Sequence, residues 1–151
     1  MTAEVLPPAL AEIVDLFASS PPRDRLELLL EYSYQIPPLP ERYAQHPERL
    51  EAVPECQSPL FVAAELDDDR RVHLFVDAPP EAPTTRGFAG IFHAGLDGLS
   101  AEEVLAVPGD VTARMALAEV VSPLRLRGAA ALLGRVQRQV RERLAAAPPT
   151  A

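Results

Sequence analysis

The sequence predicts an α+β fold in which a small antiparallel sheet packs against N-terminal and C-terminal helices. Apolar residues recur at helical spacing before residue 36 and again after residue 85. Between these regions, residues 60–77 alternate between apolar and polar side chains around a polar turn, as the strands of a hairpin do. The chain has 151 residues, of which 48% are hydrophobic, as expected for one globular domain. We therefore expect a single domain over residues 1–151, with its core at about residues 9–145.

Two helices are predicted in the N-terminal region. The first opens at the prolines of residues 7–8 and presents one apolar face, made of Leu10, Ile13, Val14 and Phe17. A break at residues 19–22 separates it from a second helix that runs to about Gln35. The Pro-rich segment 36–54 then forms a long connection, with one helical turn expected at residues 47–51. Connections of this length are usually functional or linker-like.

The sheet is predicted from two strands, at residues 60–66 and 72–77, joined by a polar turn at residues 67–70. Val53 is a candidate for a short third strand. The alternation places one set of apolar side chains on the same face, namely Leu60, Val62, Ala64, Leu66, Val72, Leu74 and Val76.

Four helices are predicted after the sheet. The first carries Phe88, Ile91 and Phe92 and ends near Gly98. A capping box at residues 100–103 starts a short second helix, and Asp110 is expected to cap a third helix that runs to about Val121. After Ser122 and Pro123, the last long helix has an inner stripe made of Ala129, Leu132, Leu133, Val136, Val140 and Leu144. We expect the tail from Pro148 to be frayed.

Charge and composition exclude several classes of partner. The net charge is −8, and an acidic chain repels phosphate backbones, so we expect no nucleic-acid partner. No run of 18 apolar residues is present, so we expect no membrane span. The N-terminus lacks the basic and apolar regions of a secretory signal, and the single cysteine cannot form an intrachain disulfide. These features favour the cytoplasm.

No pattern for a bound metal or cofactor stands out. The three histidines, His46, His73 and His93, are far apart in the chain, and residues 67–69 lack the Gly and Glu of a calcium loop. There is no Gly-rich phosphate loop. Arginines of the last helix are interpreted as its solvated face and secondarily as a docking surface; they are Arg135, Arg138, Arg141 and Arg143.

Cys56 is the residue with the clearest potential for chemistry. Free cysteine is among the most buried residue types, which favours a structural role as a small hydrophobe. Cys56, however, lies outside every periodic apolar segment, between Pro54 and Pro59 and next to a predicted strand. Functional groups often occupy such loops. The residues alone leave both interpretations open.

Three short motifs resemble those of the SufE-type sulfur-acceptor family. The first is Val-Pro-Glu-Cys-Gln-Ser at residues 53–58, and the second is Arg-Gly-Phe at residues 86–88. The third, at residues 122–128, is Ser-Pro-Leu-Arg-Leu-Arg-Gly and matches the family's Ser/Thr-Pro-x-Arg-x-x-Gly element before the final helix. Their order and spacing agree with the family from about Leu10 to Leu144.

The resemblance implies that Cys56 accepts sulfur as a persulfide from a pyridoxal-phosphate-dependent cysteine desulfurase. It also implies that the protein stimulates the desulfurase and passes sulfur to an iron–sulfur scaffold protein. The chain would then be a sulfur-transfer partner without a bound cofactor, as a monomer or weak homodimer. Arg125 corresponds to the family's arginine, with a role toward the thiolate or persulfide or in docking. Gly87 and Gly128 correspond to turn residues that shape the site.

One position departs from the family, which commonly has Gly before the cysteine where this chain has Glu55. Glu adopts a positive φ far less readily than Gly, so the loop backbone is expected to differ locally. A carboxylate beside the thiol also disfavours the thiolate. Two other functions remain open: an adaptor that activates a desulfurase without carrying sulfur, and a one-cysteine redox protein. The second lacks another cysteine to resolve a sulfenic acid.

Overall fold

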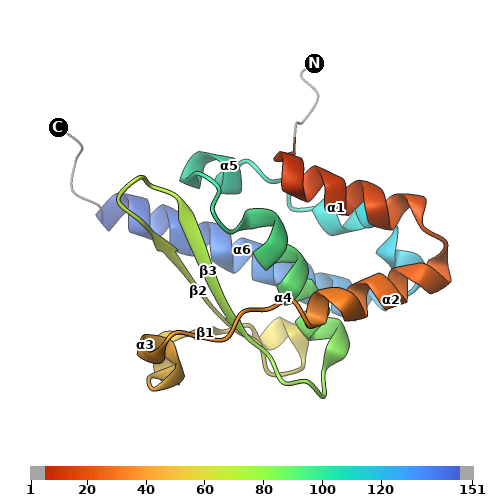
Figure 1. Ribbon diagram of the computed structural model, residues 1–151, viewed down its shortest axis with the longest axis horizontal. Coiled ribbons are helices and arrows are strands. Elements are labelled where there is room, and N and C mark those ends of the chain that lie inside the picture. The colour runs from red at the N-terminus through yellow and green to blue at the C-terminus, as the bar shows by residue number, and fades with distance from the viewer. Residues whose placement is uncertain (1–5, 147–151) are drawn as a thin grey trace.

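The computed structural model describes residues 6–146 and confirms the α+β class (Figure 1). Three antiparallel strands form one sheet in the order β1-β2-β3. The strands are β1 (Glu51–Ala52), β2 (Phe61–Leu66) and β3 (Val72–Asp77). The helices are α1 (Pro8–Ser19), α2 (Pro22–Ser33), α3 (Glu41–Ala44), α4 (Pro83–Leu96), α5 (Ala101–Leu105) and α6 (Pro123–Ala146). Four 3-10 turns complete the described chain: η1 (Pro47–Arg49), η2 (Pro54–Cys56), η3 (Val111–Met115) and η4 (Leu117–Glu119).

The β2–β3 hairpin matches the prediction closely, with Ala64 opposite Leu74 in the register. The third strand was predicted at Val53, but β1 lies at the two residues before it. The backbone N–H of Val53 still donates to the carbonyl of Leu60 at 2.9 Å. Val53 therefore continues the pairing at the point where the chain turns into η2.

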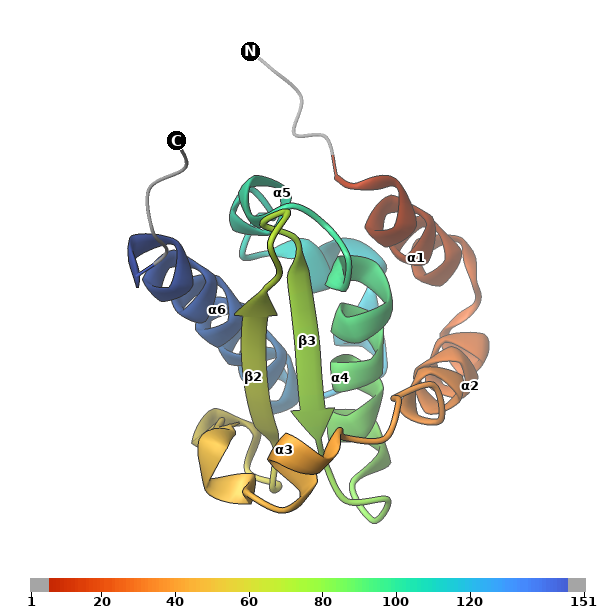
Figure 2. The same ribbon diagram turned by 60° about the vertical axis from the view of Figure 1, so that its left-hand side comes forward.

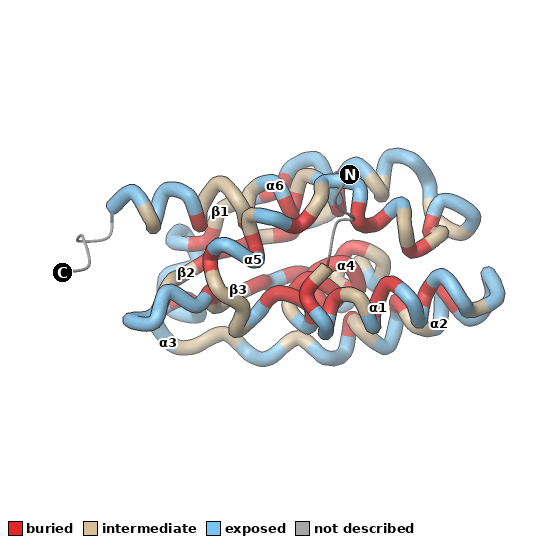
Figure 3. The backbone as a smooth tube through the Cα atoms, turned by 90° about the horizontal axis from the view of Figure 1, so that it is seen from above, coloured by how far each residue is buried: buried red, intermediate tan, exposed pale blue. Residues whose placement is uncertain are grey.

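Helices α4 and α6 cover one face of the sheet, and α1 and α2 pack outside α4 (Figure 2). Viewed from above, the buried residues line the facing sides of these layers (Figure 3). The predicted inner stripe of α6 is buried as far as Val140, and Leu144 is partly buried. The opposite face of the sheet carries a small cluster in which Tyr43 and Leu50 cover Ala63. The four-residue helix α3, which supplies Tyr43, was not predicted, because it is too short to show periodicity.

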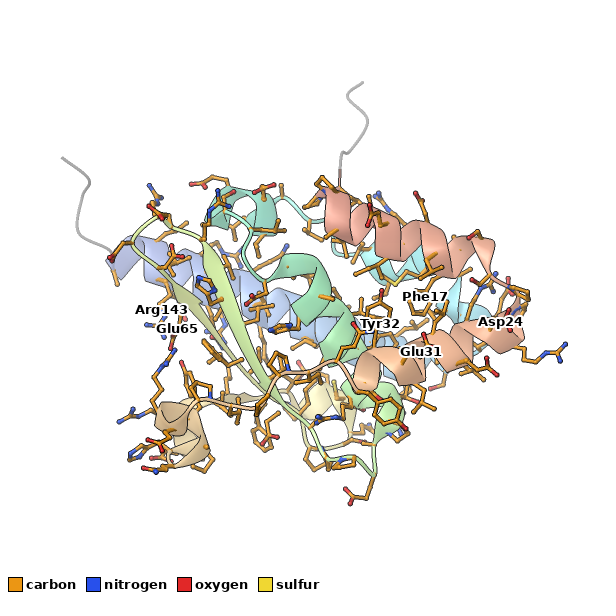
Figure 4. All side chains as sticks on the ribbon, viewed as in Figure 1. Phe17, Asp24, Glu31, Tyr32, Glu65 and Arg143 are labelled. Atoms are coloured by element: carbon orange, nitrogen blue, oxygen red, sulfur yellow. The ribbon has the colours of Figure 1, made fainter. Side chains whose placement is uncertain are left out.

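The N-terminal helices follow the prediction, except that α2 ends at Ser33 rather than at about Gln35. All four predicted inner residues of α1 are buried. The rings of Phe17 and Tyr32 face each other between α1 and α2, with centroids 5.9 Å apart (Figure 4). Arg25 of α2 is only 7% exposed and donates to the carbonyls of Phe17 and Ala116 at 3.0 and 3.2 Å. It also pairs with Glu119 at 2.7 Å.

Residues 110–121 do not form the single helix that was predicted. They form η3 and η4, separated by Ala116, which has a left-handed φ of 55°. The Asp110 side chain makes no capping hydrogen bond. The change of direction at Ala116 lets Met115 and Leu117 both be fully buried, and the buried Arg25 binds the Ala116 carbonyl. Tertiary packing thus overrides the local helical preference.

The connection between α4 and α5 covers the first part of the outer edge of β3. The N–H of Val72 donates to the Leu99 carbonyl, and its carbonyl accepts from the Gly98 N–H, both at 2.7 Å. The Leu74 N–H donates to the carboxylate of Asp97 at 2.8 Å. Gly98, predicted near the end of α4, follows it by two residues with a φ of +88°, which allows this turn. The capping box of α5 forms as predicted. In residues 6–146, no helix has the length and apolar character to cross a membrane.

Candidate functional site around Cys56

Cys56 is the last residue of η2, the turn that links β1 to β2. Pro54 begins the turn, and the N–H groups of Cys56 and Gln57 donate to the carbonyls of Val53 and Pro54 at 3.2 and 3.0 Å. Gln57 then reverses the chain with a left-handed φ of 57°. Cys56 is only 6% exposed, so this loop residue is also buried. Both features that the sequence suggested for Cys56 are therefore present.

The Cys56 turn rests on α6 at Gly128. A Cβ atom at position 128 would lie 2.8 Å from the Cys56 Cα and 2.9 Å from its Sγ, which is too close for any other residue without movement. Gly87 has a comparable role in α4, where a Cβ would lie 2.5 Å from the carbonyl oxygen of Leu29. Gly87 was expected in a turn but lies within α4. Gly128 lies within α6, the last predicted helix, and both glycines permit a close approach.

Arg125, one turn before Gly128, holds the chain at and after Cys56. Its Nη1 donates to the Cys56 carbonyl and to the Ser58 hydroxyl, both at 3.1 Å. A longer contact of 3.4 Å reaches the hydroxyl of Thr85 at the start of α4. Arg125 therefore links the loop to two helices through the backbone of Cys56. The motifs predicted that Arg125 lies near Cys56, but they did not predict its contacts with Ser58 and Thr85. Ser58 ends the motif at residues 53–58, and Thr85 directly precedes the motif at residues 86–88.

Arg135 binds the chain before Cys56. Its Nη2 lies 2.6 Å from the Glu55 carboxylate, and its Nε donates to the Ala52 carbonyl at 3.2 Å. The prediction that Arg135 belongs to a solvated face is therefore wrong in part. Glu55, which stands where the family commonly has Gly, has no positive φ. The left-handed residue of the turn is Gln57 instead.

Burial sets the protonation state of the site. Removal from water raises the pKa of the Cys56 thiol to about 11, and the Glu55 carboxylate contributes to this rise. The positive charges of Arg125 and Arg135 act in the opposite direction. Only the thiolate is nucleophilic, so the thiol in this position is protonated and unreactive at neutral pH.

Comparison with known proteins agrees with this arrangement. The family model named SufE, an Fe-S metabolism associated domain, matches residues 11–140. The chain belongs to the SufE family. The resemblance that the three motifs suggested is thereby confirmed, and the matched range includes every residue of the Cys56 site.

Three similar proteins support this membership of the SufE family. An uncharacterised SufE-like protein of Mycobacterium tuberculosis is 50% identical over 143 residues, which is 94% of this chain and 99% of that protein. The SufE-like protein 1, chloroplastic/mitochondrial, of Arabidopsis thaliana is 31% identical over 90% of this chain, which spans 36% of that longer protein. The solution structure of a hypothetical protein from Thermus thermophilus is 42% identical, with a TM-score of 0.82 over 93% of this chain and 99% of that one.

The other side chains considered from sequence lie away from the Cys56 site of this SufE domain. His73 contacts Asp67 at 2.8 Å and lies 3.8 Å from Asp97, while His46 contacts Glu48 at 3.1 Å. Within the described residues, no group of three or more His, Cys, Asp or Glu side chains is placed to hold a metal. A cavity of about 250 Å³ between residues 36–39 and β3 is lined by His73 and His93 but not by Cys56.

Proposed function

We propose that this SufE-family protein accepts sulfur on Cys56 from a pyridoxal-phosphate-dependent cysteine desulfurase and passes it on for iron–sulfur cluster assembly. The observation that carries the proposal is the position of Cys56, the chain's single cysteine. It ends a short turn that two residues of the third motif, Arg125 and Gly128, seat on α6. Membership of a family associated with Fe-S metabolism gives this thiol its context.

The proposed transfer is a thiol exchange on sulfur. The Cys56 thiolate attacks the terminal sulfur of a persulfide on the desulfurase. A new S–S bond forms at the Cys56 Sγ, the S–S bond of the donor breaks, and the donor cysteine leaves as a thiolate. No external oxidant or reductant is needed, since one persulfide replaces another. Delivery to a scaffold protein repeats the exchange, with Cys56 as the leaving thiolate.

The buried position of Cys56 suits storage rather than attack. A thiol whose pKa is raised to about 11 by burial forms little thiolate at neutral pH. We infer that the loop moves out of its seat on Gly128 when it meets the desulfurase, which removes the burial that raises the pKa. A persulfide that returns to the seat is sheltered from oxidation.

Persulfide detection tests the proposal directly. The protein is incubated with a cysteine desulfurase and cysteine, and mass spectrometry is used to look for one added sulfur on Cys56. We expect this modification in the wild type and a faster turnover of the desulfurase. Cys56→Ser is the control, because a hydroxyl cannot form a persulfide, and it should bind the desulfurase without stimulating it.

The two alternative functions give different results in the same experiment. If Cys56→Ser stimulated the desulfurase as strongly as the wild type, the protein would be an adaptor and not a sulfur acceptor. A sulfenic acid on Cys56 without any added sulfur would favour a redox protein. A free thiol is preserved in a reducing compartment, so we propose that the protein acts in the cytoplasm. We also propose that it is a monomer or a weak homodimer. Sedimentation at several concentrations measures the association state.

A further inference from the structure

Two arginines of α6 bind the Cys56 loop from opposite sides. Arg125 binds the carbonyl of Cys56 and the chain after it, whereas Arg135 binds Glu55 and the chain before it. Gly128 lies between them, three residues after Arg125 and seven before Arg135. These spacings place all three residues along one face of the helix, with the arginines about 15 Å apart along its axis. The loop is therefore fastened at both ends and seated in the middle.

We infer that Arg135 is a positioning residue that, through its ion pair with Glu55, keeps Cys56 seated on α6 until the pair opens. The inference rests on the proposed function, in which the thiol must leave the seat to accept and deliver sulfur. Arg135 also donates to the Ala52 carbonyl at 3.2 Å, so it holds β1 and η2 together. Opening the pair with Glu55 frees the residue directly before the thiol.

The exposure of the ion pair indicates how strongly it holds. The side chain of Arg135 is 22% exposed and that of Glu55 is 46% exposed. An ion pair this accessible to water changes an equilibrium by about fivefold or less. The ion pair of Arg135 and Glu55 therefore favours the position of the loop on Gly128, and it can break while the domain stays folded.

The charges of Glu55 and Arg135 also change the pKa of the Cys56 thiol. This electrostatic effect can be separated from the effect of the ion pair on the position of the loop. The negative charge of Glu55 raises the pKa of Cys56, while the positive charge of Arg135 lowers it. If charge alone mattered, removing Arg135 would slow the reaction of Cys56 and removing Glu55 would speed it. If the ion pair holds the loop, removing either partner should expose the thiol and speed the reaction.

The test is the rate at which iodoacetamide alkylates Cys56 in the full chain, without any desulfurase. The variants are Glu55→Gln, Arg135→Gln and the double variant, with Arg141→Gln as a control on an exposed position of the same helix. We expect each single variant to react about two- to fivefold faster than the wild type. The double variant should react no faster than the faster single variant, and the control should match the wild type.

Ionic strength and amide exchange provide readouts that a general loss of stability would not reproduce. About 1 M NaCl should speed alkylation of the wild type but not of the double variant, because salt screens an ion pair. Amide exchange at Cys56 and Gln57 should accelerate in both single variants, while amides of β3 remain protected. An Arg135→Gln variant that reacts at or below the wild-type rate would overturn the inference, and so would additive effects in the double variant. Neither result would affect the persulfide experiment, which has its own readout.

Discussion

Cys56, the proposed sulfur acceptor, occupies a buried position. The residue is only 6% exposed. It packs so closely on Gly128 that a Cβ atom at position 128 would collide with Cys56. The same contacts that protect the sulfur raise its pKa to about 11. In the proposed function, the position of the loop controls the reactivity of this thiol.

The buried thiol makes the stability of the protein depend on pH in alkaline solution. Its pKa is about 11 in the folded chain and about 8.5 to 9 in an unfolded one, so the unfolded chain loses this proton first as the pH rises. The contribution of Cys56 to stability is therefore complete below about pH 8.5 and is lost as the pH rises through 11. Between about pH 7 and pH 10, the wild type should lose roughly 1.5–2 kcal/mol more than Cys56→Ser.

Urea unfolding of both proteins at the two pH values measures this difference. Tyr43, whose pKa is raised to about 12 by burial and by its hydrogen bond to Glu65, is common to both proteins and cancels. An equal loss of stability in the two proteins would show that the pKa of the Cys56 thiol is not raised by folding.

At the residue scale, the sequence identified Cys56 and Arg125 as candidate site residues because both lie in short motifs. The ion pair of Glu55 and Arg135 was not predicted, since 80 residues separate the partners along the chain. Spacing along α6 provided a signal, because Arg135 lies on the same helical face as Arg125 and Gly128. That signal becomes meaningful only after the loop has been placed against this face.

At the element scale, α6 offers two glycines for a direct comparison. A Cβ at Gly128 meets the backbone of Cys56, whereas at Gly134 it meets no atom within 4 Å. Replacing Gly by Ala in an open helical position stabilises a protein by up to about 1 kcal/mol. We expect this gain for Gly134→Ala, and a loss of about 1–3 kcal/mol for Gly128→Ala because the loop must shift.

Thermal unfolding of the two variants, followed by circular dichroism, gives the comparison. Cys56 of Gly128→Ala should also react faster with iodoacetamide than Cys56 of the wild type, because the displaced loop exposes the thiol. Equal melting temperatures for the two variants would contradict the close contact between Gly128 and Cys56.

Arg25 joins three elements, and its removal should be costly. The buried guanidinium binds the carbonyl of Phe17 at the end of α1, the carbonyl of Ala116 between η3 and η4, and the Glu119 carboxylate. Arg25→Leu fills much of the space but removes the donor to the Ala116 carbonyl and the ion pair with Glu119, while the Phe17 carbonyl keeps only the Ser20 N–H. We expect a loss of about 2–4 kcal/mol in the free energy of unfolding by urea. Arg23→Leu, on an exposed position of α2, is the control and should change stability by less than about 0.5 kcal/mol.

Regular elements were predicted well where their apolar residues repeat over several turns or strand positions. This holds for α1, the hairpin and α6, whose predicted inner faces are largely buried. The segments that were missed are short or depend on distant contacts. Helix α3 has four residues, and the change of direction at Ala116 lies beside the Arg25 side chain, 91 positions earlier in the chain. The local pattern of apolar residues does not predict contacts between residues so far apart in the sequence.

At the scale of the whole molecule, one large core should make the described chain unfold as a unit. Residues from α1, both long strands, α4 and α6 belong to the same buried cluster. We therefore predict a single cooperative transition in urea, with coincident curves from circular dichroism and tyrosine fluorescence. EDTA should leave the transition unchanged, since we expect no bound metal. Two separated transitions would contradict the prediction of one domain.

The covered start of the β3 edge has a consequence for how one molecule behaves toward another. A strand with unpaired backbone groups is a template on which a second molecule can extend the sheet, and this is a common route to aggregation. The chain after α4 already occupies hydrogen-bonding groups of Val72 and Leu74 on this side. Opposite it, β1 has only two residues, and short edge strands are poor templates. The geometry therefore disfavours growth of the sheet at β1 and at the start of β3.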